Sequence, residues 1–539
     1  MQLLDNATVL SATDLNNFLA CEHLTALDLA VLHDGLTRPQ ARPGQATLLA
    51  ELGEAHERTY LEKLRDDGFD VVTIDRTRDL WAAAEATKAA MWSGARIIYQ
   101  ATFFDGVWVG HADFLRKVDE RLEGGRWDWH YEVEDTKLAR HTEPYFLLQL
   151  CYYSEHVARV QGAAARSMHV VLGNGERHSF RVDDFAAYYR DVKKRFLQRL
   201  GENAPTYPLH VDHCSLCVWD SACTARRTKD DHLSGVAGIT RLQTGRLNDA
   251  GIATLAALAL APDTARPDKM VAPTFEKLRR QARLQDEQRR ALAANDLHPY
   301  RYEFIEDAVP NHRGFCLLPE PSPGDVFFDM EGDPYFDIGT GLEYLFGAYT
   351  ADDETFTPFW GCDRSERPAS DRLAEKRAFE AFIDFVMKRR ERFPAMHVYH
   401  YAAYEKTALQ KLSLRHATRE DEVDTILREE MLVDLYRVVR QALVVGQPSY
   451  SIKKIEEYYG KRGDASGVKG GDESILQFEA WLAARGAGKR NDALLDDLQT
   501  YNEYDCVSTY GLRQWLLELR AKAAAELGEF IDSAGLLHH

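Results

Sequence analysis

The sequence predicts an α/β fold in which two regions of mixed strands and helices are joined by a helical segment. Short apolar runs of strand length occur within 102–140 and again within 323–360, and both regions also contain segments with apolar residues at helical spacing. The stretch between them, HLSGVAGITRLQTGRLNDAGIATLAALALA, has only the helical spacing and is punctuated by glycines. We therefore expect three parts: residues 1–228, 229–310 and 311–539.

Length and composition limit the classes of protein to which this chain can belong. A chain of 539 residues should hold more than one domain, and a hydrophobic content of 45% is ordinary for packed cores. The net charge of −19 argues against binding nucleic acid chiefly through a broad basic surface. No apolar stretch is long enough for a membrane span, and the N-terminal residues carry acids where a signal peptide would carry basic residues. These features predict a cytoplasmic protein.

The middle part is expected to be a helical linker. LNDAGIATLAALA resembles a helix–hairpin–helix unit, which would hold a DNA backbone through glycine-turn amides, and an ordinary linker fits these residues equally well. The charged stretch that follows, FEKLRRQARLQDEQRRALAAN, is predicted to be an exposed helix.

Four cysteines form a one-plus-three set that brackets the first part of the chain. Cys21 stands alone near the N-terminus, and Cys214, Cys217 and Cys223 lie together in HCSLCVWDSAC. Cysteines in a chain of this class favour thiolates and metal ligation over disulfides. Closely spaced cysteines can converge on one metal centre. If Cys21 joins the other three cysteines at that centre, it connects the N-terminal helix to the far end of the same domain. Four thiolates suit either structural zinc or an iron–sulfur cluster.

Within the cysteine bracket lies a set of residues suited to metal-assisted phosphodiester hydrolysis. His56 is expected on an amphipathic helix, and Asp113 on a strand or its turn, after Gly110. The alternating run from Tyr131 is a predicted strand that places Asp135 and Lys137 on the same face. Carboxylates there would hold Mg²⁺ or Mn²⁺, and the lysine would orient water and offset charge on the phosphate.

A predicted helix, PYFLLQLCYYSEHV, adds Gln149 and Tyr153 four residues apart on one face. Each of these signals is weak alone, because a lone histidine or an Asp-Thr-Lys is common on ordinary surfaces. The complete set, in order and inside the cysteine bracket, favours a nuclease. Glu132 and Glu134 leave open which acid is the ligand, and Asp135 is preferred because Lys137 follows two residues later.

This pattern resembles the RecB-type branch of the PD-(D/E)xK nucleases, which have a helical histidine, a GxxD, a D-x-K strand and a QxxxY helix. The resemblance implies a restriction-endonuclease-like domain over 1–228, with a metal held by His56, Asp113, Asp135 and the backbone carbonyl of Thr136. The cysteine arrangement resembles the iron–sulfur forms found in CRISPR adaptation nucleases and in the AddB subunit of recombination nucleases. It implies a 4Fe–4S cluster on four residues: Cys21, Cys214, Cys217 and Cys223.

The third part holds a second, independent acidic set. A predicted strand ends in Asp329-Met330-Glu331, with both carboxylates on one face. A predicted hairpin follows, and then a short strand feeds a helix with Glu405 near the junction. A final helix carries Tyr501 and Asp505 four residues apart. Four converging acids would hold two metal ions, and Tyr501 would help position the attacking water.

These motifs resemble the DnaQ-like 3′–5′ exonucleases of the ribonuclease H-like fold, most closely the YprB-type branch. The resemblance implies a mixed-sheet exonuclease domain over 311–539. The chain departs from the family pattern at Tyr404-Glu405, where an aspartate is usual after the aromatic residue. Asp434 is an additional acid that would either assist or cap a helix. A ribonuclease H-like scaffold that only binds nucleic acid is the competing interpretation.

Together the two sets predict a metal-dependent DNA nuclease with two active sites that processes ends or single strands in repair, recombination or defence. The resemblance also implies a superfamily 1 helicase as a partner, in the same or a separate chain. No GxxxxGK[ST] motif is present, so the sequence contains no phosphate-binding loop of this type. The alternative is a cluster-stabilised adaptor that positions a helicase or another nuclease, with a non-catalytic C-terminal domain.

Overall fold

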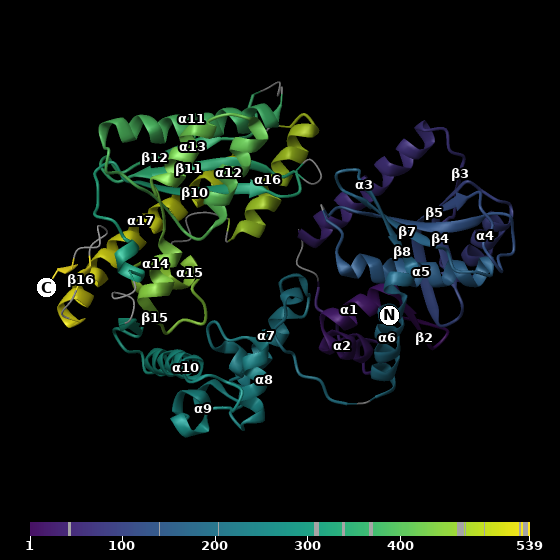
Figure 1. Cartoon of the computed structure of the whole chain (residues 1–539), viewed down its shortest axis with the longest axis horizontal. Helices are drawn as coiled ribbons and strands as arrows, with labels where there is room; N and C mark the ends of the chain where they lie inside the picture. The colour runs from purple at the N-terminus through teal and green to yellow at the C-terminus, as the bar shows by residue number, and fades with distance from the viewer. Residues whose placement is uncertain are drawn as a thin grey trace. The chain divides into compact units, whose positions relative to one another are not determined.

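The computed structural model describes residues 1–40, 45–139, 141–202, 204–306, 312–336, 340–365, 370–460, 468, 470–489, 491–527, 530–531 and 537–538. The α/β class is confirmed, and the chain forms two compact units (Figure 1). The first unit is Met1–Arg226, and the second contains Arg227–Phe336 and Gly341–His539. The boundary predicted near residue 311 lies outside the described residues.

The first unit is built on one mixed sheet, in the order β1-β2-β5-β6-β7-β8, with β4 also paired to β5 and β3 to β4. The pairs β4–β5 and β5–β6 are antiparallel, whereas β6–β7 is parallel. The strands are β1 (Gln2–Leu4), β2 (Ala7–Ser11), β3 (Val71–Thr73), β4 (Ile97–Phe104), β5 (Trp108–Val118), β6 (His130–Lys137), β7 (Ser167–Leu172) and β8 (Arg177–Arg181).

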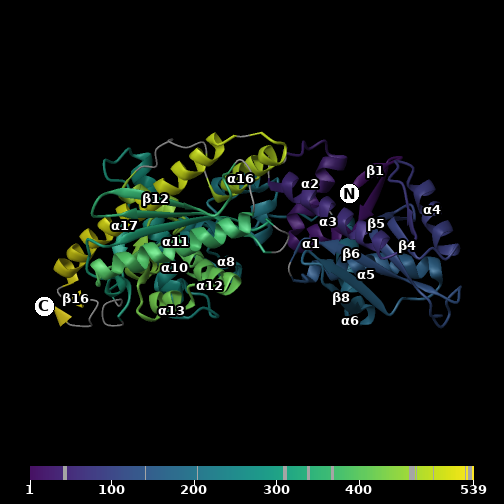
Figure 2. The same ribbon diagram turned by 90° about the horizontal axis from the view of Figure 1, so that it is seen from above.

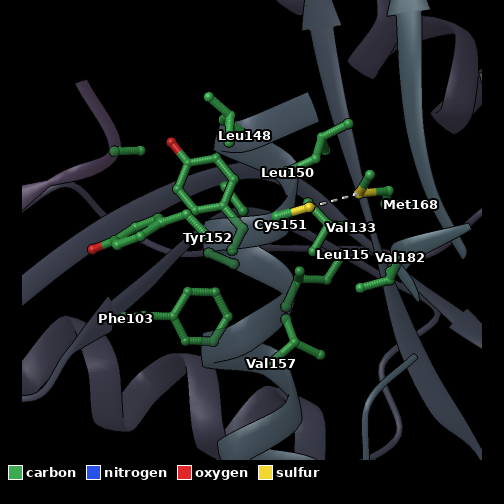
Figure 3. Close-up of a cluster of buried hydrophobic side chains, with 14 of the residues drawn as sticks. Phe103, Leu115, Val133, Leu148, Leu150, Cys151, Tyr152, Val157, Met168 and Val182 are labelled. Atoms are coloured by element: carbon green, nitrogen blue, oxygen red, sulfur yellow. Dashed lines mark hydrogen bonds between the residues drawn. The ribbon is translucent and has the colours of Figure 1, made fainter. Parts of the chain in front are cut away.

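Helix α5 (Pro144–Gln161) packs its apolar face against this sheet (Figure 3). It begins at a proline, which suits the first turn, and ends before Gly162, whose φ of 89° suits a left-handed cap. Tyr152 and Val157 of α5 are fully buried with Val133 of β6. The other principal helices are α1 (Ala12–Ala20), α2 (Glu22–His33), α3 (Gln45–Asp66), α4 (Leu80–Trp92), α6 (Val182–Gly201) and α7 (Asp220–Lys229).

The second unit contains a five-stranded sheet in the order β12-β11-β10-β13-β14. The central strand β10 runs antiparallel to β11 and parallel to β13. The strands are β10 (Val326–Asp333), β11 (Leu342–Thr350), β12 (Thr355–Trp360), β13 (Val398–His400) and β14 (Leu432–Asp434). The β11–β12 pair is the predicted hairpin, with its turn at 351–354.

Helices cover both faces of this sheet (Figure 2). Along β10, Phe327 packs with residues of α14 and α17, and the next residue, Phe328, packs with residues of α11 and α12. An apolar residue at successive positions is expected for a strand buried on both sides. The helices are α11 (Asp371–Arg392), α12 (Tyr404–His416), α13 (Glu420–Arg428), α14 (Leu435–Ala442), α15 (Ile452–Ile455), α16 (Gly471–Gly486) and α17 (Ala493–Leu527).

The middle segment forms α8 (Arg241–Asp249), α9 (Leu255–Leu260) and α10 (Ala272–Ala293), which share a small apolar core. The prediction that the charged stretch in α10 is an exposed helix was wrong. Gln281, Gln285 and Gln288 of α10 are buried. Their side chains bond main-chain groups, with Gln281 Nε2 donating to the carbonyl of Val445 at 2.8 Å. Val445 lies in β15 (Leu443–Val445), which pairs with β9 (Tyr302–Phe304).

The physical reason for this error is that long amides can be buried when backbone partners satisfy them, so polar composition alone did not indicate exposure. No helix in the described part of the chain is both long and apolar enough to cross a bilayer.

Candidate metal centres

In the first unit, Asp113 of β5 and Asp135 of β6 lie close enough to interact. Asp135 is fully buried and forms an ion pair with Lys137. Asp113 Oδ2 accepts hydrogen bonds from Thr136, from N at 2.9 Å and from Oγ1 at 2.8 Å. Burial and then the charge of Asp113 raise the pKa of Asp135 to about 7. A cation between the two acids would relieve this repulsion, so the donor set fits a metal ion.

His56 of α3 faces the same acids. Its ring hydrogen-bonds the backbone of Val171, while its Nε2 is buried without a hydrogen-bond partner. Burial lowers the pKa of His56, which keeps the imidazole neutral at neutral pH. A neutral imidazole with one nitrogen anchored and the other unpaired is the usual state of a histidine ligand.

The β4–β5 ladder is interrupted where it reaches Asp113. The residue pairs on either side are regular, but Gln100 of β4 has a φ of 58° and is unpaired opposite Asp113. Gln100 accepts from Arg76 Nε at 2.6 Å and donates to Glu57. Burial and the charge of Asp113 raise the pKa of Glu57, so this carboxyl also belongs to the site. Sequence reasoning missed Glu57 and Gln100, and the only available signal was that Glu57 adjoins His56.

The neighbouring acids of β6 are engaged elsewhere. Glu134 pairs with Arg116 at 3.1 Å, and Glu132 contacts His169 at 2.8 Å. Although burial opposes it, hydrogen bonds from histidines lower the pKa of Glu132 to about 2. Because side chains alternate along a strand, both acids point away from the face of Asp135.

Gln149 and Tyr153 of α5 meet at the same site. Gln149 Nε2 donates to Tyr153 Oη at 2.9 Å, and burial followed by the charge of Asp135 raises the pKa of Tyr153. Gly110 allows this approach, since a Cβ there would lie 2.9 Å from Tyr152 and 3.2 Å from Tyr153. This contact gives a packing reason for the glycine that precedes Asp113.

The bracketing cysteines come from separate elements of the first unit. Cys21 lies between α1 and α2, Cys214 lies in a 3₁₀ turn (Asp212–Leu216) and Cys223 lies in α7. Burial, and after it the nearby thiols of Cys21 and Cys214, raise the pKa of Cys217. The fold thus places the thiols of Cys21 and Cys214 within electrostatic range of Cys217. Within the described residues, no three of these sulfur atoms lie within 4.8 Å of one another.

In the second unit, one ligand atom each from Asp329, Glu331 and Asp505 lies within 4.8 Å of the others. We call these three residues the acidic trio. Asp329 and Glu331 project from the same face of β10, and α17 brings Asp505 to that face. Among the described residues, this is the one group in which three metal-binding side chains come so close.

The trio is supported by hydrogen bonds that sequence reasoning missed. Asn502 Nδ2 donates to Asp329 Oδ2 at 2.7 Å, and Ser474 Oγ donates to Glu331 Oε2 at 2.6 Å. Asn502 lies three residues before Asp505 on the helix that the sequence predicts, so this spacing could have identified it. No pattern in the sequence points to Ser474, which lies on α16.

Crowding of like charges dominates the electrostatics of the trio. Burial, then Asp505, Glu331 and Glu405, raise the pKa of Asp329 well above its usual range. Burial and the charge of Asp505 raise the pKa of Glu331 to about 8, against the opposing hydrogen bond from Ser474. Three closely spaced acids that repel one another fit one or more divalent cations.

Glu405 is buried at the start of α12, outside the 4.8 Å group but close enough to affect Asp329. Its Oε2 lies 3.3 Å from Nδ1 of His400. The turn before it contains Ala402 with a φ of 74°, and the N–H of Ala402 donates to Asp434 at 2.9 Å. Asp434 also accepts from the N–H of Tyr436 at 3.0 Å, so its role is to cap α14.

Tyr501 lies one turn before Asp505 and is buried against Tyr344 and Phe478. Lys453 of α15 stands 5.9 Å from the centre of the Tyr501 ring, and its charge lowers the pKa of Glu331. Helix α15 therefore brings a cation close to the trio.

Comparison with known proteins agrees with this geometry. The profile of the RNase_H superfamily matches residues 326–517, a range that includes the trio and Glu405. No curated protein matches the chain. Nucleases of this superfamily usually use Mg²⁺ or Mn²⁺, in keeping with the carboxylate cluster. The C-terminal part of the chain is therefore an RNase H superfamily domain, and this points to a nuclease that acts on nucleic acid.

Proposed function

We propose that this chain is a metal-dependent DNA nuclease with two active sites, which processes ends or single strands in repair, recombination or defence. The observation that carries the proposal is the acidic trio of Asp329, Glu331 and Asp505, within 4.8 Å of one another in the RNase H superfamily domain.

In the second unit, the trio and Glu405 would hold Mg²⁺ or Mn²⁺, which would supply Lewis-acid activation of water and stabilisation of the leaving oxygen. Asn502 and Ser474 orient two of the carboxylates through their hydrogen bonds. In our proposal Tyr501 positions the attacking water and Lys453 attracts the phosphate. This division of roles corresponds to a 3′–5′ exonuclease.

In the first unit, His56, Asp113, Asp135 and the carbonyl of Thr136 would hold one cation. Lys137, now paired with Asp135, would orient water and neutralise charge on the scissile phosphate. Gln149 and Tyr153 would position the strand beside it. The buried, unpaired Nε2 of His56 supports this assignment.

We further propose that Cys21, Cys214, Cys217 and Cys223 hold a 4Fe–4S cluster. The proximity of three of the thiols supports a shared metal centre. Four thiolates also suit structural zinc, and the iron and zinc content of the protein would distinguish the two metals. A helicase partner and a cytoplasmic location complete the proposal.

The decisive experiment uses end-labelled single- and double-stranded DNA and RNA, incubated with the full chain and Mg²⁺ or Mn²⁺. Lys137→Ala disables the first site, Asp329→Ala disables the second, and the double variant disables both. We expect the wild type to cleave the substrate, each single variant to keep part of this activity, and the double variant to have none. Lys117→Ala is the matched control, because Lys117 lies on the same sheet but contacts Trp129.

Full activity in Asp329→Ala together with none in Lys137→Ala would make the second unit a binding scaffold. Binding without cleavage by the wild type, under all metal conditions, would replace the nuclease with the adaptor.

A further inference from the structure

A pocket of about 360 Å³ lies in the first unit between α4, the end of β4 and the C-terminal half of α5. Its volume falls within the ~300–1,000 Å³ that small-molecule sites occupy. None of the residues assigned above to the two carboxylate sites lines it. Trp92, Phe103 and Phe104 provide aromatic walls, and His156 also lines the pocket.

His156 is the buried polar group of this pocket. Its side chain is 4% exposed, and its Nε2 has no hydrogen-bond partner. The ring stacks on Phe103, with the centroids 5.7 Å apart. Burial and the charge of Arg159 lower the pKa of His156 to about 4, so the imidazole is neutral at neutral pH. A neutral, unpaired ring nitrogen in the wall of a pocket can form one hydrogen bond to a ligand.

Trp92 provides an exposed flat wall. It is 56% exposed, and Trp127 holds it edge-on with the ring centroids 5.2 Å apart. Phe104 is fixed in the same way by Trp81 at 4.7 Å. Anchored aromatic rings at a pocket suit a planar ligand, because a second ring can stack on them without loss of side-chain freedom.

Three cations, Lys88, Arg126 and Arg159, line the pocket together with one acid, Asp105. Asp105 is neutralised by Arg159 at 2.6 Å and accepts a hydrogen bond from the N–H of Trp108 at 2.7 Å. Arg159 also pairs with Glu155, and Lys88 pairs with Glu85 at 2.6 Å, so among the described residues Arg126 is the lining cation that forms no ion pair. A guanidinium without an acidic partner attracts phosphate.

Helix α5 connects the pocket to the first carboxylate site. His156 and Val160 lie three and seven residues after Tyr153, so they fall on the same face of the helix, about 4.5 and 10 Å further along its axis. A strand bound at the carboxylates would therefore meet the pocket within a few nucleotides.

We infer that this pocket receives an unstacked base of single-stranded nucleic acid, with the adjoining phosphate at Arg126. The inference rests on the proposed function and narrows its substrate to a strand with free bases. A base needs a flat aromatic partner and an edge contact, and its phosphate needs a cation; the pocket has all three. A base paired and stacked in a duplex cannot enter it.

The test measures binding separately from cleavage. The full chain with Lys137→Ala and Asp329→Ala is titrated, with EDTA present, against a labelled single strand, its duplex and the same strand carrying abasic positions. Fluorescence anisotropy reports the affinity. Adding Trp92→Ala should weaken single-strand binding about tenfold and leave duplex binding unchanged. Tyr188→Ala, which removes an aromatic residue 53% exposed on α6 and outside the pocket, should change neither.

His156→Phe gives an independent test, because phenylalanine preserves the stack on Phe103 but removes the ring nitrogen. It should weaken binding of the normal strand and leave binding of the abasic strand unchanged. Unchanged melting temperatures would show that both variants are folded.

Three results would overturn the inference: equal affinity of Trp92→Ala and Tyr188→Ala, equal binding of normal and abasic strands, or binding of the mononucleotide dAMP as tight as that of the strand. If the wild type cuts nothing but Trp92→Ala still loses strand binding, the proposed function fails and the pocket assignment stands. If the wild type cuts nucleic acid and Trp92→Ala binds the single strand normally, the proposed function stands and the pocket assignment fails.

Discussion

Asn502 donates a hydrogen bond to Asp329 across 173 positions of sequence, at a distance of 2.7 Å. The contact is possible because β11 has a glycine at Gly347, where a Cβ would lie 1.8 Å from Asn502 Oδ1. Helix α17 can therefore lie against the central strand, with Asn502 orienting one acid of the trio and Asp505 supplying another.

This arrangement predicts the effect of two substitutions. Asn502→Ala should lower Mn²⁺ affinity or C-terminal activity by roughly 10- to 100-fold, the usual range for a residue that orients a metal ligand. Gly347→Ala should give a similar loss, because the added methyl displaces Asn502. Isothermal titration with Mn²⁺ and cleavage in a Lys137→Ala background would measure both. Gly245→Ala, where nothing lies within 4 Å of the new methyl, is the control and should be silent.

The second prediction concerns pH and metal. Without a cation, the pKa of Glu331 is raised to about 8, above its ordinary value near 4.5. The folded state then holds this proton more tightly than the unfolded state, so its stabilising effect is complete below about pH 4.5 and is lost as pH rises to 8. We expect the melting temperature in EDTA to fall across this window.

Mn²⁺ should reverse this loss, and more strongly at pH 8 than at pH 5, because protons compete with the metal for the carboxylates. Asp505→Asn removes one of the charges and should reduce both the slope with pH and the response to Mn²⁺. Identical melting curves with and without Mn²⁺ at pH 8 would contradict a metal site at the trio.

The third prediction concerns the cysteines. Protein purified without oxygen should be brown and contain iron, as thiolate-ligated clusters are. Cys217→Ser should lose the colour and lower the stability of the first unit, because cluster binding contributes to folding free energy. Cys316→Ser, which alters a cysteine of the second unit, should keep the brown colour and the stability of the first unit. Stoichiometric zinc without iron in the anaerobic protein would refute the iron–sulfur cluster.

The fourth prediction concerns Glu405. Its longer side chain fits the strict octahedral geometry of Mg²⁺ less well than that of Mn²⁺, so the C-terminal activity should be higher with Mn²⁺. Glu405→Asp should keep or raise this activity and narrow the difference between the two metals. Initial rates on a single-stranded 3′-end substrate would measure it, with Glu429→Asp, on an exposed acid near β14, as the control. A complete loss of activity in Glu405→Asp would show that the glutamate length is required.

Local patterns in the sequence predicted the framework of the second unit. Alternation placed Asp329 and Glu331 on one face of β10, the turn signal located the β11–β12 hairpin, and a spacing of four placed Tyr501 and Asp505 on α17. These features depend on the backbone geometry of a few consecutive residues, so they can be predicted from the sequence without knowing the fold.

The supporting contacts were decided only by tertiary structure. Ser474 reaches Glu331 across 143 positions, Gln100 presents Glu57 to Asp113 at a break in a sheet, and the glutamines of α10 are buried because distant main-chain groups satisfy them. Hydrogen-bond partners so far apart leave no periodic signal, since any polar residue satisfies the local pattern equally well. The sequence by itself determined which acids could act, and the packing of distant segments decided which of them meet and what orients them.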